Sequence, residues 1–183
     1  MKNHFSFTAA AMFFLFLAFT VHTEAGTLTT TMPISVQISG GCSLSATGIN
    51  FGNYAAGPSA PALTATGTIS VTCPSSLPYK VSLNSGTAIQ NGVIGPNGPV
   101  VNRAMTFSNN EQLGYELYKD AARTTIWGDS DLANTYPNGS SQSGTGIGAN
   151  QTLTVFGLVP GGQLISAPTN ASGTDTITVT LLF

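Results

Sequence analysis

Paired carboxylates are the residues of this chain whose types and spacing come nearest to catalytic chemistry. Asp129 and Asp131 flank a single serine, and Glu111 and Glu116 lie just before and within one alternating segment. Two carboxyl groups can carry out glycoside hydrolysis, and Asp-x-Asp can open a calcium loop. The other calcium ligands are missing, and no second constellation supports chemistry. We interpret the aspartates as turn residues that follow Trp127, and the glutamates as solvating an outer face.

A nucleophilic serine or cysteine would need a neighbouring base, which is normally histidine. His4 and His22 are the two histidines of the chain, and both lie in an amino-terminal segment that we expect to be removed. Lys80 and Lys119 fall in alternating segments and lack the Ser-x-x-Lys spacing of lysine-based catalysis. The sequence therefore predicts that the protein is not an enzyme, and it suggests no catalytic, cofactor-binding or metal-ligating residue.

The amino-terminal segment has the parts of a secretory signal peptide. Lys2 supplies a positive charge, residues 9–19 form an apolar run, and Ala25 ends an acceptable cleavage site. The run is too short for a membrane anchor. We expect residues 1–25 to be cleaved and the rest of the chain to be exported in soluble form.

The composition of the chain favours strands over helices. Five basic and seven acidic residues give a formal net charge of −2, and so few cations argue against nucleic acid or anionic lipid as a partner. Gly, Thr, Ser, Asn and Ala dominate, which suits short strands joined by tight turns. We therefore predict an all-β protein.

Alternating apolar residues predict a β-sandwich of about seven short strands in one domain. Residues 129–150, rich in Gly, Ser and Asn, are predicted to be a flexible surface loop. In the last predicted strand Ile177, Val179 and Leu181 share a face that Phe183 continues. The predicted strands cover residues 49–54, 66–73, 79–84, 103–107, 113–120, 153–159 and 175–183.

Cys42 and Cys73 are the only cysteines of the chain. In an exported protein two cysteines most simply form one disulfide, which would stabilise the fold by roughly 3–4 kcal/mol. A metal site would need further ligands that the sequence does not supply. Free thiols are the remaining alternative.

A further alternating strand precedes the first cysteine, between residues 27 and 42. Pro33 removes one backbone donor, which suits an edge strand, and Gly40-Gly41 offers a hinge. The segment could therefore extend away from its own domain and cover an apolar edge elsewhere. The residues on its apolar face are Leu28, Thr30, Met32, Ile34, Val36 and Ile38.

The order of several segments resembles the spore coat protein U domain family, which includes pilin subunits of archaic chaperone–usher pili. The resemblance covers essentially the whole chain after the signal peptide, with one departure at Gly173, where family members often carry tyrosine. The matching segments are CSLSATGINFGNY (42–54), GTISVTC (67–73), YKVSL (79–83), RAM (103–105), LGYELYKDAARTTIWGD (113–129), TVFGLVPGGQ (154–163) and DTITVTLLF (175–183).

The resemblance implies an incomplete immunoglobulin-like β-sandwich that lacks its last strand and is completed by a donor strand. It implies three parts: a signal peptide at 1–25, a donor-strand extension at 26–41 and a pilin domain at 42–183. The apolar face of the extension would be the donor. The acceptor groove, which is also the chaperone edge, would include Ile177, Val179, Leu181 and Phe183.

The implied function is that of a structural subunit of a surface pilus, or fimbrium, supporting adhesion and biofilm formation. The implied partners are a periplasmic chaperone, an outer-membrane usher and other pilin subunits, with a homopolymer expected and no nucleic acid or small-molecule cofactor. Export would run through the periplasm to the cell surface.

Two alternatives remain open. One is an adhesin that binds a sugar or host surface through Trp127 or the 129–150 loop, although a lone tryptophan is more often in the core. The other is a self-complemented spore-coat or cell-coat protein in which residues 28–38 fold back into their own groove.

Overall fold

The computed structural model describes residues 32–33, 35, 41–93, 100–166 and 170–183. The chain divides into two units, Met1–Gln37 and Ile38–Phe183, and the strands found among the described residues belong to the second. The signal peptide and the domain boundaries at residues 25 and 41 stay predictions. Among the described residues, no helix has the length and apolar character needed to cross a membrane.

The described part of the chain contains nine strands and no helix, so the all-β prediction is confirmed. The predictions near residues 66–73, 79–84, 103–107, 113–120 and 153–159 each correspond to a strand. The strands are β1 Ser43–Ala46, β2 Leu63–Thr72, β3 Pro78–Leu83, β4 Ile89–Val93, β5 Val100–Thr106, β6 Gln112–Tyr118, β7 Gln142–Thr145, β8 Asn150–Val159 and β9 Val179–Leu182.

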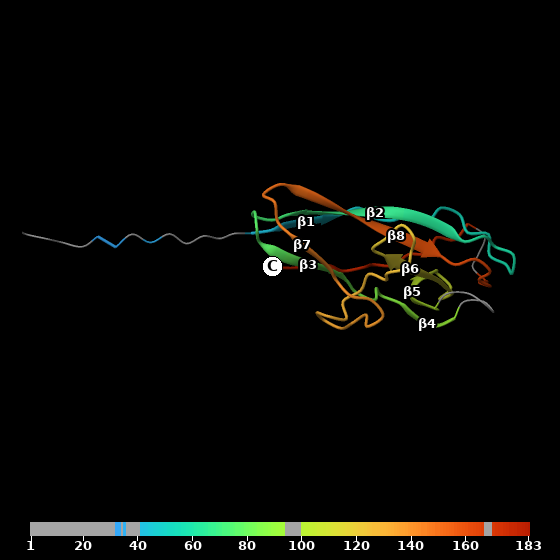
Figure 1. The fold of residues 1–183 in the computed structure, drawn as a ribbon. Helices are drawn as coiled ribbons and strands as arrows, with labels where there is room; N and C mark the ends of the chain where they lie inside the picture. Colours follow the sequence, from blue (N-terminus) through green and yellow to red (C-terminus); the bar gives the residue numbers. More distant parts are fainter. Residues whose placement is uncertain (1–31, 34, 36–40, 94–99, 167–169) are drawn as a thin grey trace, which may run out of the picture. The chain divides into compact units, whose positions relative to one another are not determined.

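The described strands form two antiparallel sheets that pack together as a sandwich (Figure 1). The larger sheet has the order β1-β2-β8-β6-β5-β4, and the smaller has the order β7-β3-β9. Alternation in β2 turns Ile69 and Val71 inward, where they join Val81 and Leu83 of β3 in one core cluster. The two sheets therefore share a single hydrophobic core.

Strand β6 is buried on both faces, unlike the half-exposed strand that its sequence predicts. It lies between β5 and β8, with Tyr115 and Leu117 in the core. Glu116, on the opposite face, is also buried, because Tyr136 from the loop after β6 covers it and donates a hydrogen bond to its carboxylate. The prediction that Glu116 solvates an outer face is wrong; Glu111, before the strand, is partly exposed.

The predicted surface loop at 129–150 contains a strand of its own. Residues 142–145 form β7, which pairs with β3 and places Gly144 opposite Tyr79. A Cβ on Gly144 would lie 2.3 Å from the Tyr79 ring, so any larger residue there would displace that ring. The loop prediction is wrong for these four residues, because a short Ser/Gly/Thr strand carries no apolar alternation.

Candidate functional site: an open groove

Two segments that are far apart in the sequence run along an open groove. Residues 46–56 line one side and residues 170–179 line the other. We call them the first rim and the second rim. Among the described strands, β9 at the end of the second rim is hydrogen-bonded only to β3, so its other edge is open.

The structure of the first rim contradicts one strand prediction. Residues 49–54 form no strand, although Ile49 and Phe51 alternate with Asn50 as a strand requires. The segment is fastened at its ends instead. Thr47 donates its N–H to the carbonyl of Thr68 (2.8 Å), and the Tyr54 hydroxyl accepts the N–H of Gln163 (2.8 Å). The strand prediction for residues 49–54 is therefore wrong: the apolar alternation is present, but among the described strands none pairs with this segment.

The floor of the groove is apolar and comes from both sheets. It lines two neighbouring chambers, of about 340 and 880 Å³, which share Ile49, Phe51, Met105 and Gly173. Ile69, Leu83, Tyr115, Leu117 and Val155 line the smaller chamber, and Leu63, Phe107, Leu113, Val159 and Ile165 line the larger. Sequence reasoning did not identify these residues as a site, because apolar strand residues look the same whether they lie under a groove or inside a closed core.

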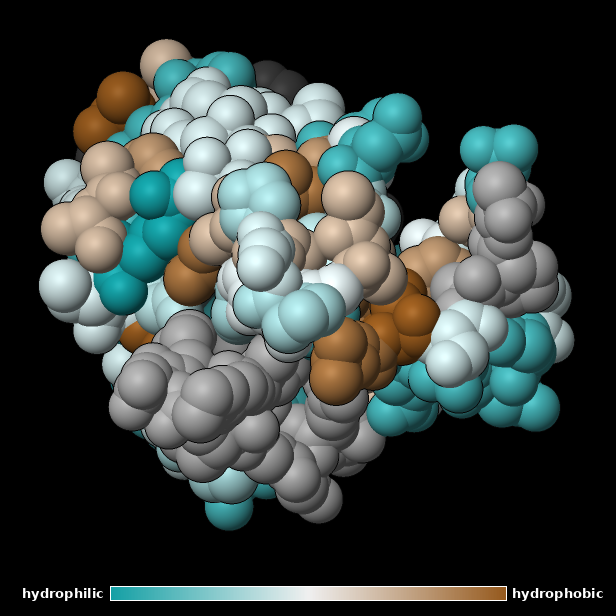
Figure 2. Space-filling model, turned by 90° about the vertical axis from the view of Figure 1, so that its right-hand side faces the viewer, coloured by the Kyte–Doolittle hydropathy of each residue, from teal (hydrophilic) through white to brown (hydrophobic). Residues whose placement is uncertain are grey.

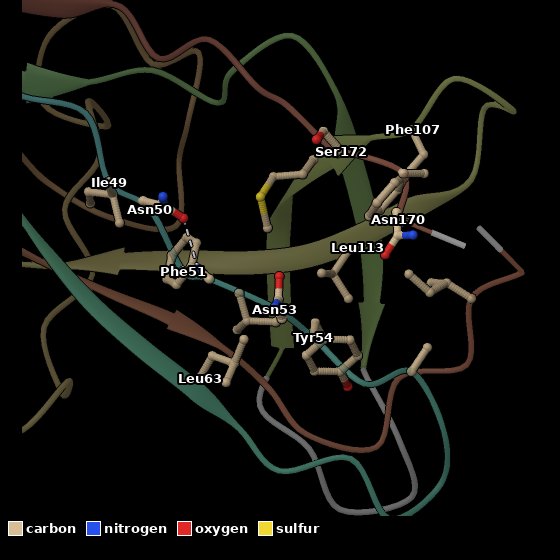
Figure 3. Close-up of a pocket in the computed structure, with 17 residues that line it drawn as sticks. Ile49, Asn50, Phe51, Asn53, Tyr54, Leu63, Phe107, Leu113, Asn170 and Ser172 are labelled. Atoms are coloured by element: carbon tan, nitrogen blue, oxygen red, sulfur yellow. Dashed lines mark hydrogen bonds between the residues drawn. The ribbon is translucent and has the colours of Figure 1, made fainter. Parts of the chain in front are cut away.

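The larger chamber opens at the end of the domain opposite the start of β3. Figure 2 looks onto this end and shows apolar side chains gathered at the base of a notch. Figure 3 shows Asn50, Asn53 and Tyr54 along the first rim and Asn170 and Ser172 along the second, with Leu113 between them. The chamber thus has a polar margin and an apolar floor.

Two aromatic rings meet across the floor between the rims. The ring centroids of Phe51 and Tyr115 are 5.9 Å apart, with the planes inclined by 54°. The Tyr115 hydroxyl donates a 2.6 Å hydrogen bond to Asp175 of the second rim. Burial, followed by this hydrogen bond and the charge of the carboxylate, raises the pKa of Tyr115 far above its usual value. Tyr115 is therefore a neutral donor at any physiological pH.

The predicted acceptor residues lie along the second rim and beyond it. Ile177, Val179 and Leu181 are partly buried and pack against the core on one face, as the alternation indicates. Of the four, Ile177 and Val179 line the groove. Phe183 follows the end of β9 and is 56% exposed. Their role as an acceptor edge stays a prediction.

Most of the predicted donor residues lie outside the described residues. Leu28, Thr30, Ile34, Val36 and Ile38 belong to this group, and Met32 is described only as an exposed residue outside any strand. The donor assignment stays a prediction.

The predicted disulfide is confirmed, and it joins Cys42 to Cys73. Cys42 immediately precedes β1, and Cys73 immediately follows β2. The bridge therefore fastens the point at which the chain enters the folded domain to one of its two longest strands.

The candidate catalytic carboxylates hold a loop together. Asp129 is buried and accepts hydrogen bonds from the backbone N–H of Tyr136 and the hydroxyl of Thr135. Asp131 accepts the N–H and the hydroxyl of Ser141, both at 2.7 Å. Each carboxylate thus serves the turn role that we inferred from the sequence. Within the described residues, no group of three or more His, Cys, Asp and Glu side chains could hold a metal.

Trp127 is part of the core and presents no sugar-stacking surface. It is 1% exposed, and its Nε1–H donates a 2.9 Å hydrogen bond to the carbonyl of Val81. The interpretation of Trp127 as a core residue is confirmed.

The groove and the two sheets belong to a recognisable class of protein. The family model of the Spore Coat Protein U domain matches residues 28–180, and the chain belongs to this family. No curated protein sequence gives a significant match.

Among solved structures, the chain is similar to one described as the CsuC–CsuE chaperone–tip adhesion subunit pre-assembly complex from archaic chaperone–usher Csu pili of Acinetobacter baumannii. The identity is 25% and the TM-score is 0.46, over 78% of this chain and 39% of that chain. The chain therefore spans well under half the length of the chain it matches.

Proposed function

We propose that this protein is a structural subunit of a surface pilus that polymerises by donating a strand to the groove of the next subunit. The observation that carries the proposal is the groove itself: an apolar floor between two rims, one without a strand and one ending at an open sheet edge. An edge strand left in this state is an aggregation hazard, and a natural protein covers it.

Residues 28–38 of a second copy are the proposed occupant. They belong to the same family match and carry the alternating face Leu28, Thr30, Met32, Ile34, Val36 and Ile38. An extended peptide of this kind pairs its backbone with a sheet edge and sends alternate side chains into pockets.

The dimensions of segment and groove support this occupant. At about 3.3 Å per residue, an extended segment 28–38 would span about 36 Å, and the second rim, 170–179, has nearly as many residues. Burial of each large apolar side chain would contribute about 1.5–3 kcal/mol. Because donor and groove belong to different copies, the contact is head to tail and builds an open filament.

The proposed function also implies the binding partners of the protein and its location in the cell. A periplasmic chaperone would occupy the groove before assembly, and an outer-membrane usher would be the site of exchange. Residues 1–25 would direct export, 26–41 would be the donor extension, and 42–183 would be the pilin domain. Ile177, Val179, Leu181 and Phe183 would form the acceptor edge. Adhesion and biofilm formation would follow from the filament at the cell surface.

Charged substitutions on the two faces of the extension test the proposal. Ile34→Asp and Val36→Asp would place a carboxylate in a dry groove, so we expect export without filaments. Ser35→Asp carries the same charge on the opposite face and should assemble normally. The protein purified from the periplasm would be refolded, and its size followed by light scattering and electron microscopy.

Three results would overturn the proposal. The first is filament growth by both groove-face variants at the rate of the unsubstituted protein. The second is an unsubstituted protein that stays a stable monomer, which would mean that residues 28–38 fill their own groove. Deleting residues 27–38 should leave a domain that cannot donate a strand, so continued polymerisation of that variant is the third.

A further inference from the structure

Asp175 lies on the second rim and uses both carboxylate oxygens to fasten that rim to the rest of the domain. Oδ1 accepts the N–H and the hydroxyl of Thr87, at 2.7 and 2.6 Å, and the N–H of Thr176 at 2.7 Å. Oδ2 accepts the hydroxyl of Tyr115, in the groove floor. One side chain therefore joins the rim, the turn after β3 and the floor.

The turn after β3 is shaped around this carboxylate. Gly86 has a φ of 84°, and a Cβ at that position would lie 2.1 Å from Oδ2 of Asp175. Asn84 fastens the rim a few residues further on: its N–H donates to the carbonyl of Thr178, and its Oδ1 accepts the N–H of Thr178 at 2.8 Å. Both attachments join the second rim to the segment that follows β3.

These contacts hold a segment that is not a strand. Residues 175–178 precede β9, and Thr174 forms only an isolated bridge to Thr106. A segment with few strand partners ordinarily opens at low free-energy cost. The Asp175 contacts oppose such opening at the centre of the groove, because Asp175, Ile177 and Val179 all line the smaller chamber.

We infer that Asp175 is a positioning residue for strand acceptance: it holds the second rim and the Tyr115 ring in place before the incoming strand arrives. The inference rests on the proposed function, since it presumes that a strand enters the groove. Fixing a binding surface in advance removes ordering costs from the binding step. Loss of Asp175 should therefore slow assembly more than it lowers the stability of the folded domain.

A purely structural role would affect folding and assembly alike, so the test compares the two. Asp175→Asn offers one acceptor oxygen in place of two, and Tyr115→Phe removes only the hydroxyl. The matched control is Asp120→Asn, because Asp120 also accepts hydrogen bonds from Thr124 and Thr125 but lies away from the groove. The full exported protein would be used for every variant.

Two glycine variants test the positioning role of Asp175 without changing its side chain. Gly86→Ala would push a methyl group into Asp175. Gly148→Ala imposes the same kind of backbone strain at a φ of 73°, but its Cβ would meet only the Ser75 hydroxyl, at 2.9 Å. The difference between the two variants isolates the Asp175 contact from the cost of a positive φ.

We expect filament growth, corrected for the folded fraction, to slow by about tenfold or more in Asp175→Asn, as loss of a hydrogen bond to a charged group predicts. Tyr115→Phe and Gly86→Ala should be slowed in the same direction, and both controls should match the unsubstituted protein. Amide hydrogen exchange at Thr176 and Thr178 should accelerate in the slowed variants before assembly.

Growth of Asp175→Asn and Gly86→Ala at the unsubstituted rate would overturn this inference and leave the proposed function intact. Failure of the unsubstituted protein to polymerise would instead overturn the proposed function, and the inference with it.

Discussion

Arg103 and Glu116 form a fully buried ion pair, in which Nη1 of the arginine lies 2.6 Å from Oε1 of the glutamate. The other arginine nitrogens donate to the carbonyls of Leu83, Asn84 and Trp127, between 2.7 and 3.1 Å. The guanidinium also stacks over the Tyr136 ring, 4.0 Å from its centroid. One arginine thus ties β5 and β6 to the end of β3, whose Leu83 lines the groove.

Removing either partner of this pair should destabilise the domain strongly. We expect Arg103→Leu to lower the free energy of unfolding by about 3–5 kcal/mol, because Glu116 would stay buried without its countercharge. The exposed pair of Lys80 and Asp131, at 2.9 Å, is the control, and Lys80→Met should cost no more than about 1 kcal/mol. Urea denaturation measures both, and equal losses would contradict the prediction.

Reduction of the disulfide should lower stability without changing the fold. Cys42 and Cys73 are 31 residues apart, and closing a loop of that length contributes about 3–4 kcal/mol in the chain-entropy model. Denaturation with and without dithiothreitol measures the loss, and Cys42→Ala/Cys73→Ala should reproduce it. The double variant should then be insensitive to dithiothreitol. Identical curves for the oxidised and reduced protein would rule out this contribution.

The alternation of apolar and polar residues correctly predicted the strands that lie between two neighbouring strands or that bury one face in the core. Ile69 and Val71 of β2 and Val81 and Leu83 of β3 alternate along their strands, and all four are buried. The disulfide could also be predicted from the sequence, because the prediction needs only the expected export of the protein to an oxidising compartment and the number of cysteines.

What the sequence could not supply depends on neighbours that are distant in the chain. Glu116 is polar and alternates outward, so nothing local indicates that Arg103 and Tyr136 will bury it. Ile49 and Phe51 have a strand pattern, but whether a strand forms depends on a partner edge, and here the groove takes that place. The residues of the groove floor could not be predicted for the same reason, because the sequence does not show which part of the fold will cover a given apolar residue.

Trp127, the single tryptophan, should report a dry environment in the native protein. Its side chain is 1% exposed, so we expect blue-shifted emission and weak quenching by acrylamide, with both changing together on unfolding. Trp127→Ala should cost about 3–5 kcal/mol of stability. Saccharides should leave the emission unchanged, whereas a saturable change at native pH would revive the adhesin hypothesis.

Asp131 should make stability depend on pH in the acid range. The N–H of Ser141, then the Lys80 ammonium and the Ser141 hydroxyl, hold the pKa of this carboxyl well below its usual value of about 4. A lowered pKa in the folded state stabilises the protein above the unfolded-state pKa, and this contribution is lost as the pH falls through the folded value.

We therefore expect Asp131→Asn to lower the free energy of unfolding by about 1 kcal/mol at pH near 7, a modest value because a third of the side chain is exposed. The difference between Asp131→Asn and the unsubstituted protein should shrink steadily below pH about 4, where the unfolded carboxyl takes up its proton. Lys80→Met should show a weaker form of the same trend, because only the ammonium is lost. Urea denaturation at a series of pH values measures these differences. A difference that stays constant from neutral to acid pH would show that Asp131 acts through packing and not through its charge.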